Sequence, residues 1–342
     1  MTVTDTRMPK TGALVISLDF ELSWGVRDRH QAVNGYTQNL LGARAAVPRV
    51  LDLFTEFEVA STWAVVGLLF ARSREQLLAL TPKLRPHYKD ARLDPYQEAV
   101  GESEADDPLH FAPSLIERII STPGQEIATH TFSHYYCLEE GQSKEAFEAD
   151  LLNAIGVAES YGLNIKSIVF PRNQHNSEYT DVLLRNGIMC YRGNQRHRMY
   201  SAAATDQVTR RQRFGRLIDS YLPLSGSNAT AWSDIVEPSG LCNVPSSRFL
   251  RPYQRRLAGI DPLRRRRIEA SMEVAAKTNQ VFHLWWHPHN FGSELEENLG
   301  FLRSILNHYL KLRDGYGMRS LTMAEAAQIA RSLDRRDTDA TG

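Results

Sequence analysis

The sequence predicts an α/β fold in which a parallel sheet, closed into a barrel, is wrapped by helices. Strand-like and helix-like segments alternate about seven times along the 342 residues, and such alternation is typical of βαβ units. Neither an internal repeat nor a clear linker interrupts the alternation, so a single domain is expected. Seven or eight strand–helix units in one chain favour a barrel over an open sheet.

The expected strands are short, apolar and bounded by turn residues. They cover residues 13–18, 61–67, 126–129, 166–170, 188–191, 281–286 and 318–321, with 216–224 as an additional candidate. The expected helices have apolar residues at helical spacing. They cover residues 40–58, 115–120, 143–161, 263–277 and 294–313, with a short helix ending at Gly187. A last helix is expected to begin next to Thr322. The spacing between Thr322 and Glu325 predicts a capping box at its start.

The domain is expected to span residues 12–330. The polar residues 1–11 are expected to form a disordered leader, and the polar residues 331–342 a flexible tail. Residues 81–112 are rich in proline and charge, so we expect a surface insertion there, with a lid over the active site as the alternative.

Composition and charge argue against several classes of protein. The formal net charge is +0, which gives no global attraction to nucleic acid. The three cysteines are widely spaced and suit a reducing compartment better than a disulfide framework. No apolar run is long enough for a transmembrane segment, and the N-terminus lacks the apolar core of a signal peptide. We therefore expect a cytoplasmic protein.

Polar clusters follow four of the expected strands. They are DFE at 19–21, His130 with His134, PRN at 171–173 and HPH at 287–289. In a parallel barrel the carboxyl ends of the strands share one rim, where active sites are built. Two histidines four residues apart are often only a solvated helical pair. Their convergence with acids on one rim indicates a metal site instead.

The residue types at this rim suit metal-assisted hydrolysis of an amide or ester. Asp19 and Glu21 are two apart, so in an extended segment they project from the same face. One carboxylate and two imidazoles leave positions free for water and substrate. Such a metal lowers the pKa of its water and polarises the carbonyl, while the second carboxylate is free to act as a base.

Other residues at the rim have a functional and a structural interpretation. His287 can protonate the leaving amine, and Arg172 can keep the base ionised, although a structural salt bridge is the alternative for Arg172. Asn173 can bind sugar hydroxyls or simply form the turn. Trp286 can stack on a sugar ring, with core packing as its alternative. His289 is expected behind His287, as a further substrate-binding residue.

Five segments together resemble the polysaccharide deacetylase (NodB-homology) family, carbohydrate esterase family four. They are LDFE, STWAVVG, HTFSH, FPRN and LWWH, in this order along the chain. The resemblance implies a distorted (β/α)7-type barrel and a divalent metal, zinc first and cobalt as an alternative. It implies Glu21, His130 and His134 as metal ligands, Asp19 as base, Arg172 as its contact and His287 as acid.

The sequence departs from the family pattern at two motifs. The acids are separated by Phe20, and the second is glutamate, so an exchange of roles between Asp19 and Glu21 stays open. Proline precedes Arg172, whereas the family usually places it after the arginine. This chain is therefore expected to be a divergent member.

The expected activity is metal-dependent removal of an N-acetyl group from an N-acetylated sugar, with a nucleotide- or lipid-linked precursor as one form of the substrate. A cyclic amide or ureide hydrolase of the allantoinase-like branch is one alternative, and a catalytically silent carbohydrate-binding relative is another. The arginine run 264–267 is interpreted as a solvated helix face, with a phosphate contact as the alternative.

Overall fold

A computed structural model describes residues 11–28, 36–200 and 209–341. Its centre is a sheet in which the strands are paired in the order β6-β5-β4-β3-β2-β1-β8-β7, and β9 also pairs with β1. All pairings between these strands, in the part of the chain described, are parallel. The strands are β1 Ala13–Phe20, β2 Ser61–Val65, β3 Gln125–Thr129, β4 Ser167–Ile168, β5 Cys190–Tyr191, β6 Cys242–Asn243, β7 Arg248–Phe249, β8 Val281–Trp286 and β9 Arg319–Leu321.

One short segment connects the two edges of this sheet. Cys242 in β6 pairs with β5, and Arg248 in β7 pairs with β8. Between them, the Val244 amide donates to the Tyr191 carbonyl over 2.9 Å, and the Ser247 amide donates to the His283 carbonyl over 2.7 Å. The sheet is thereby curled on itself, and the predicted distorted (β/α) barrel is confirmed.

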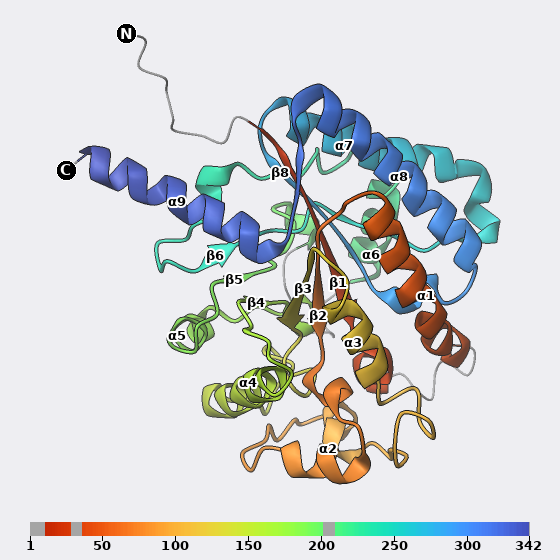
Figure 1. The fold of residues 1–342 in the computed structure, drawn as a ribbon, viewed down its shortest axis with the longest axis vertical. Coiled ribbons are helices and arrows are strands. Elements are labelled where there is room, and N and C mark those ends of the chain that lie inside the picture. The colour runs from red at the N-terminus through yellow and green to blue at the C-terminus, as the bar shows by residue number, and fades with distance from the viewer. Residues whose placement is uncertain (1–10, 29–35, 201–208, 342) are drawn as a thin grey trace.

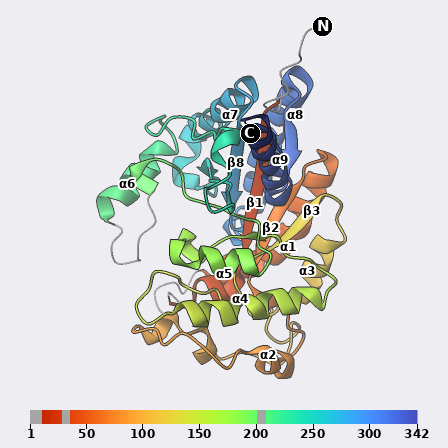
Figure 2. The ribbon, with the colours of Figure 1, turned by 90° about the vertical axis from the view of Figure 1, so that its left-hand side faces the viewer.

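Helices surround the curled sheet on its outside (Figure 1). They are α1 Thr37–Glu56, α2 Arg74–Leu80, α3 Pro113–Ile120, α4 Lys144–Glu159, α5 Thr180–Arg185, α6 Arg210–Asp219, α7 Asp261–Lys277, α8 Leu295–Tyr316 and α9 Met323–Thr341. Helices α4 and α5 lie side by side (Figure 2), joined by an ion pair between Arg185 and Glu148. None of the helices in the described ranges is long and apolar enough to cross a membrane.

Side chains of β1 alternate between two hydrophobic clusters, as expected for a strand buried on both faces. Leu14, Ile16 and Leu18 belong to the large cluster with residues of the outer helices. Ala13 and Val15 belong to a smaller cluster that also contains small residues of β2 and β3. The interior of the barrel is therefore a packed core at this end of the sheet.

Helix α9 packs on this smaller cluster. Its buried alanines, Ala326, Ala327 and Ala330, belong to the cluster. The predicted capping box at its start is confirmed: the Thr322 amide donates to the Glu325 carboxylate over 2.8 Å, and the Glu325 amide donates to the Thr322 hydroxyl over 3.2 Å. The helix continues to Thr341, so most of the segment expected to be a flexible tail is helical.

One further expectation meets a different structure, and two others are not tested. Residues 216–224 do not form a strand, because α6 ends at Asp219 and begins with a capping box of Thr209 and Gln212 that outweighs the short apolar run. Residues 81–112 form loops with two short 3₁₀ helices, Ala91–Leu93 and Pro95–Gln97, before α3. The expected leader lies almost wholly outside the described residues.

Candidate metal centre and active site

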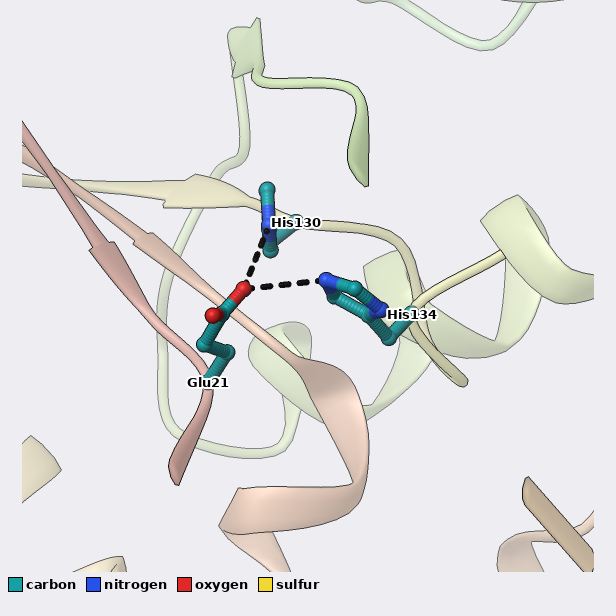
Figure 3. A group of neighbouring side chains, drawn as sticks. All are labelled: Glu21, His130 and His134. Carbon is teal, nitrogen blue, oxygen red and sulfur yellow. Dashed lines mark hydrogen bonds and ion pairs between the residues drawn. The ribbon is translucent and has the colours of Figure 1, made fainter. Parts of the chain in front are cut away.

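The carboxyl ends of β1 and β3 bring one acid and two histidines together. Glu21 follows β1, and His130 and His134 follow β3. Oε2 of Glu21 lies 2.9 Å from Nε2 of His134 and 3.3 Å from Nε2 of His130 (Figure 3). All three side chains are buried, and their ligand atoms lie within 4.8 Å of one another. This is the three-residue cluster that the sequence predicted.

The donor atoms of this cluster suit a divalent cation. Nδ1 of His130 donates to the carbonyl oxygen of Val169 over 2.8 Å, so Nε2 is the ring nitrogen that faces the cluster. This buried Nε2 atom makes no hydrogen bond to any described residue, and it lies 3.3 Å from Oε2 of Glu21. Two imidazole nitrogens and a carboxylate oxygen are the donor set typical of zinc, so a divalent cation would fit among them.

The loop that carries the two histidines has a strained backbone. Thr131 and His134 have positive φ angles of 63° and 56°, which are uncommon for residues other than glycine. Asp150 of α4 stabilises the loop, because its carboxylate accepts from the amides of Phe132 and Ser133 over 2.7 and 3.1 Å, and from the Ser133 hydroxyl. Burial raises the pKa of Asp150 to about 6 in spite of these bonds. Strain of this kind is typical of functional sites.

Arg27 connects the loop after β1 with the histidine loop. Its guanidinium donates to the backbone carbonyls of Trp24, Leu93 and His134, and Nη1 lies 3.3 Å from Nδ1 of His134. Because a guanidinium only donates, a neutral His134 carries its proton on Nε2, toward Glu21. Burial lowers the pKa of His134 to about 3, so the ring is neutral near pH 7. For Nε2 to coordinate a cation, the neutral ring would have to carry its proton on Nδ1 instead.

Gly25 gives the Glu21 carboxylate its space. A Cβ atom at Gly25 would lie 2.0 Å from Cδ of Glu21, far inside van der Waals contact. The neighbouring Leu22 has a positive φ of 45°, so the turn after β1 is itself strained. Glycine is therefore required here because the acid lies directly over its backbone.

Asp19 lies beside the cluster and pairs with Arg192. Nη1 and Nη2 of Arg192 donate to the two carboxylate oxygens over 2.6 and 2.7 Å, a bidentate geometry between two buried side chains. Burial opposes ionisation of Asp19, but Arg192 more than offsets it, so the pKa of Asp19 is lowered. Arg192 also donates to Ser17 Oγ and Asn173 Oδ1, and it lies 4.0 Å from the ring centroid of Trp285.

The predicted pairing of Arg172 with Asp19 was wrong. Arg172 donates to Asp28 over 2.6 Å, lies 3.5 Å from Glu139, and covers the ring of Tyr136 at 4.1 Å. It still contributes to the wall of the central cavity. The physical reason is that the turn after β4 adopts positive φ angles at Arg172 and Asn173, of 55° and 54°. Arg192 could have been found in the sequence, since it directly follows the expected strand 188–191.

His287 follows β8 and lies between the two acids. Its Nε2 is 3.7 Å from Oδ2 of Asp19 and 3.6 Å from Oε1 of Glu21, while Nδ1 is 3.3 Å from Oδ1 of Asn290. Burial opposes ionisation of Glu21 too, but His287 and the two cluster histidines lower its pKa well below the usual range. The partly exposed ring of His287 therefore has both carboxylates on one side.

A cavity of about 510 Å³ lies over these residues. Asp19, Glu21, His134, Asn173 and His287 belong to its wall, and none of the residues 81–112 does. His289 also lines it, stacked on His287 with ring centroids 4.9 Å apart, and burial lowers its pKa to about 3. The volume is within the range of small-molecule sites.

Trp285 lines this cavity, and the expected stacking residue, Trp286, does not. Trp286 is fully buried and packs on Phe54 and Phe291 in the core. Successive residues of a strand face opposite sides, so only one of the two tryptophans can face the barrel interior. The alternation of side chains along a strand predicts that the two tryptophans face opposite sides of the sheet. It does not show which of them faces inward.

Comparison with known proteins agrees with this geometry. The family model described as polysaccharide deacetylase matches residues 35–191. The matched segment contains His130 and His134 but begins after Asp19 and Glu21. A comparison with curated protein sequences found no match.

Several solved structures share the fold at low sequence identity. A protein assigned as a polysaccharide deacetylase from Mycobacterium smegmatis is 15% identical with a TM-score of 0.58, and the alignment covers 95% of this chain and 93% of that one. The Puue allantoinase is 12% identical with a TM-score of 0.55, covering 94% and 91%. A 4-alpha-glucanotransferase from Thermococcus litoralis is 13% identical with a TM-score of 0.52, covering 93% of this chain and 40% of the other.

At these identities the similarity establishes the fold. The family is indicated by the match over residues 35–191, by the barrel, and by motifs that stand in the family's order along the chain. Over residues 35–191, the chain is similar to the polysaccharide deacetylase family.

Proposed function

We propose that this protein is a divalent-metal-dependent hydrolase that removes the N-acetyl group from an acetylated sugar. The observation that carries the proposal is the convergence of Glu21, His130 and His134 beside a second, separately held acid, Asp19. The match to the polysaccharide deacetylase family supports deacetylation of a carbohydrate. The donor set supports a zinc-type cation, with cobalt as a substitute.

Each residue has a role that its position supports. A cation held by Glu21, His130 and His134 would supply a Lewis acid and a water of lowered pKa. Asp19, ionised by its pair with Arg192, takes a proton from the attacking water. His287 lies within reach of both carboxylates on the cavity side, where it delivers a proton to the departing amine. The C–N bond breaks, and acetate and a free amine leave.

The cavity wall supports a sugar-sized substrate. The aromatic rings of Trp285 and Phe249 line the cavity together with Asp19, and the two ring centroids lie 4.7 Å apart. Sugar rings pack well on such faces, while Asn173 and Asn290 offer amide groups for hydroxyls. An acetamido group that reaches Asp19 would thus belong to a ring resting on Trp285.

The test is release of acetate from N-acetylated sugars by the purified protein. We expect release to stop on chelation and to return on addition of zinc or cobalt. Elemental analysis of the protein before and after chelation accompanies the assay. Undiminished acetate release from protein free of metal would contradict the proposal.

A second candidate is hydrolysis of a cyclic amide or ureide. It is favoured by the altered first motif, LDFE, and by the fold shared with an allantoinase. The same metal and base would serve, but a ring would open and no acetate would form. A panel of acetamido sugars and ring amides separates the two candidates, because ring opening without acetate release decides for the second.

A further inference from the structure

A second cavity of about 260 Å³ adjoins the one over the metal cluster. Arg172, Asn173, Phe249 and Trp285 belong to the walls of both. The second cavity is lined by residues of α6, β7 and α7, and α6 and α7 lie in the same half of the molecule (Figures 1 and 2). We call this cavity the arginine pocket, because its wall contains Arg216, Arg248, Arg251, Arg264 and Arg267.

Four of these arginines have fewer carboxylate partners than they have guanidinium groups. Asp219 lies 2.6 Å from Arg248 and 3.6 Å from Arg267, and Asp261 lies 3.0 Å from Arg264. Arg251 has no carboxylate partner among the described residues, and its Nε donates to the hydroxyl of Ser220 over 2.6 Å. Among the described residues, two acids thus pair with these four guanidinium groups, which leaves an excess of positive charge there.

This excess charge is buried. Arg248, Arg264 and Arg267 are each less than 8% exposed, and their Nε atoms make no hydrogen bond to described residues. The pKa of Arg264 is lowered, first by burial and further by the positive charge of Arg251, although Asp261 opposes the shift. Buried charge without compensation is costly, so a bound anion would stabilise this arrangement.

A purely structural role accounts for only part of these contacts. Arg264 donates to the backbone carbonyls of Arg251 and Pro252, and Arg248 and Arg267 donate to that of Gly226. These bonds hold the loops around the pocket. They satisfy donors but do not neutralise charge, and they do not require a cavity that opens onto the active site.

The run of arginines at 264–267 is therefore divided between two environments. Arg264 and Arg267 are buried in the pocket wall, whereas Arg265 and Arg266 are exposed. The interpretation of the whole run as a solvated face was wrong for the two buried members. Their spacing of three places both on the side of α7 that faces the pocket.

We propose that the arginine pocket binds a phosphate or diphosphate ester attached to the acetylated sugar. The sugar part rests on the proposed function; the anion site does not. A phosphate matches the planar, bidentate guanidinium and has more acceptor oxygens than a carboxylate, so one phosphate can accept from several arginines at once. The pocket holds several times the roughly 30 Å³ occupied by one water molecule, and Trp285 lines both this pocket and the cavity over the metal cluster.

The first test measures anion binding without any reaction. Inorganic pyrophosphate is titrated into wild-type protein, R216Q/R251Q and the control R265Q/R266Q, and the heat of binding is recorded. The control removes the same charge from exposed positions of α7. We expect pyrophosphate to bind at least tenfold more weakly, by about 1.4 kcal/mol, to R216Q/R251Q but not to R265Q/R266Q. Equal binding by all three proteins would overturn the proposal.

The second test uses substrates. An N-acetylhexosamine, its 1-phosphate, its nucleoside-diphosphate ester and its lipid-diphosphate ester are compared by kcat/KM. We expect the phosphorylated sugars to be preferred at least tenfold, with R216Q/R251Q raising their KM and leaving the neutral sugar within twofold. The better of the two diphosphate esters identifies the carrier. Equal kcat/KM for neutral and phosphorylated sugars would overturn the proposal.

The two tests separate this inference from the proposed function. If no sugar loses acetate but pyrophosphate binding still depends on Arg216 and Arg251, deacetylation fails and the anion site stands. Circular dichroism and Tm measurements show whether R216Q/R251Q is folded. If it is not, the salt dependence of pyrophosphate binding to the wild type decides, since several charge contacts predict a steep loss of affinity with added salt.

Discussion

The metal cluster and the arginine pocket are two buried polar sites of opposite charge, and Trp285 lines the cavities at both. At the cluster, the carboxylate of Glu21 lies next to Nε2 of both His130 and His134. In the pocket, the guanidinium groups outnumber the acids that pair with them among the described residues. We propose that the first site binds a cation and the second an anion. Reaction and recognition are then divided between adjoining cavities of one barrel, and the following changes test this comparison in order of expected effect.

The largest effect is expected from H130A/H134A. Loss of two of three ligands should abolish metal binding and lower kcat/KM by about a thousandfold or more, because a bound cation contributes several kcal/mol to the transition state. Pyrophosphate binding in the arginine pocket should stay within twofold. Elemental analysis and calorimetry measure the two sites separately. H87A, an exposed histidine, is the control. Full metal content in the double variant would refute the assignment.

The two arginines of the cavity wall should differ strongly. R192M leaves Asp19 buried without its partner, so its pKa rises, and the acid limb of the pH–rate profile should move upward with a loss of about a hundredfold in kcat. R172M should cost only a few-fold, because Arg172 pairs with Asp28.

R192K tests whether charge alone suffices, since lysine cannot make the bidentate pair. We expect its profile to lie between those of the wild type and R192M. Equal losses in R192M and R172M would show that the pair with Asp19 has no special role.

A smaller effect is expected from G25A. The added methyl group displaces the Glu21 carboxylate, so metal affinity should fall roughly 10- to 100-fold, as for other changes that misorient a ligand. G156A on α4 is the matched control, because nothing lies within 4 Å of a Cβ there. It should leave metal affinity unchanged and stabilise the helix by up to ~1 kcal/mol. Competition with a chromogenic chelator measures the affinity.

The smallest effect concerns acid stability. The folded-state pKa of Asp19 is lowered, so its contribution is present above the unfolded value of about 3.9 and is lost as the pH falls through the folded value. Between pH 5 and 3 the free energy of unfolding should fall more steeply for the wild type than for D19N. Denaturant titrations at several pH values measure this. If the free energy of unfolding depended on pH equally in the wild type and in D19N, the result would contradict a lowered pKa of Asp19.

Much of the site was predictable because the residues that directly follow buried strands of a parallel barrel lie on one rim. The buried run before Asp19 marks a central strand, and the acids and histidines directly after such runs had to share one rim. The partner of Asp19 was not predictable in this way, because both Arg172 and Arg192 follow strands. Which one reaches the acid depends on the backbone of the turn at 171–173, where two residues adopt positive φ.

The arginine pocket was harder to predict. Arg216 and Arg251 lie on segments without a clear strand or helix pattern, and the candidate strand 216–224 is partly helix α6. Spacing alone shows that consecutive arginines point in different directions on α7. It does not show which ones are buried, since that depends on the distant loop at Gly226 that accepts from Arg267.

The position of β1 has a consequence for how the chain is made. This strand leaves the ribosome before the other strands of the sheet, yet one of its neighbours is β8, and the Ser17 hydroxyl contacts His283 across 266 positions of sequence. Contacts of such long range slow folding, and nascent chains with an unpaired strand are prone to aggregate. Shielding of the emerging N-terminal half by a chaperone should therefore raise the yield of this protein, and loss of its last sixty residues should leave no folded product.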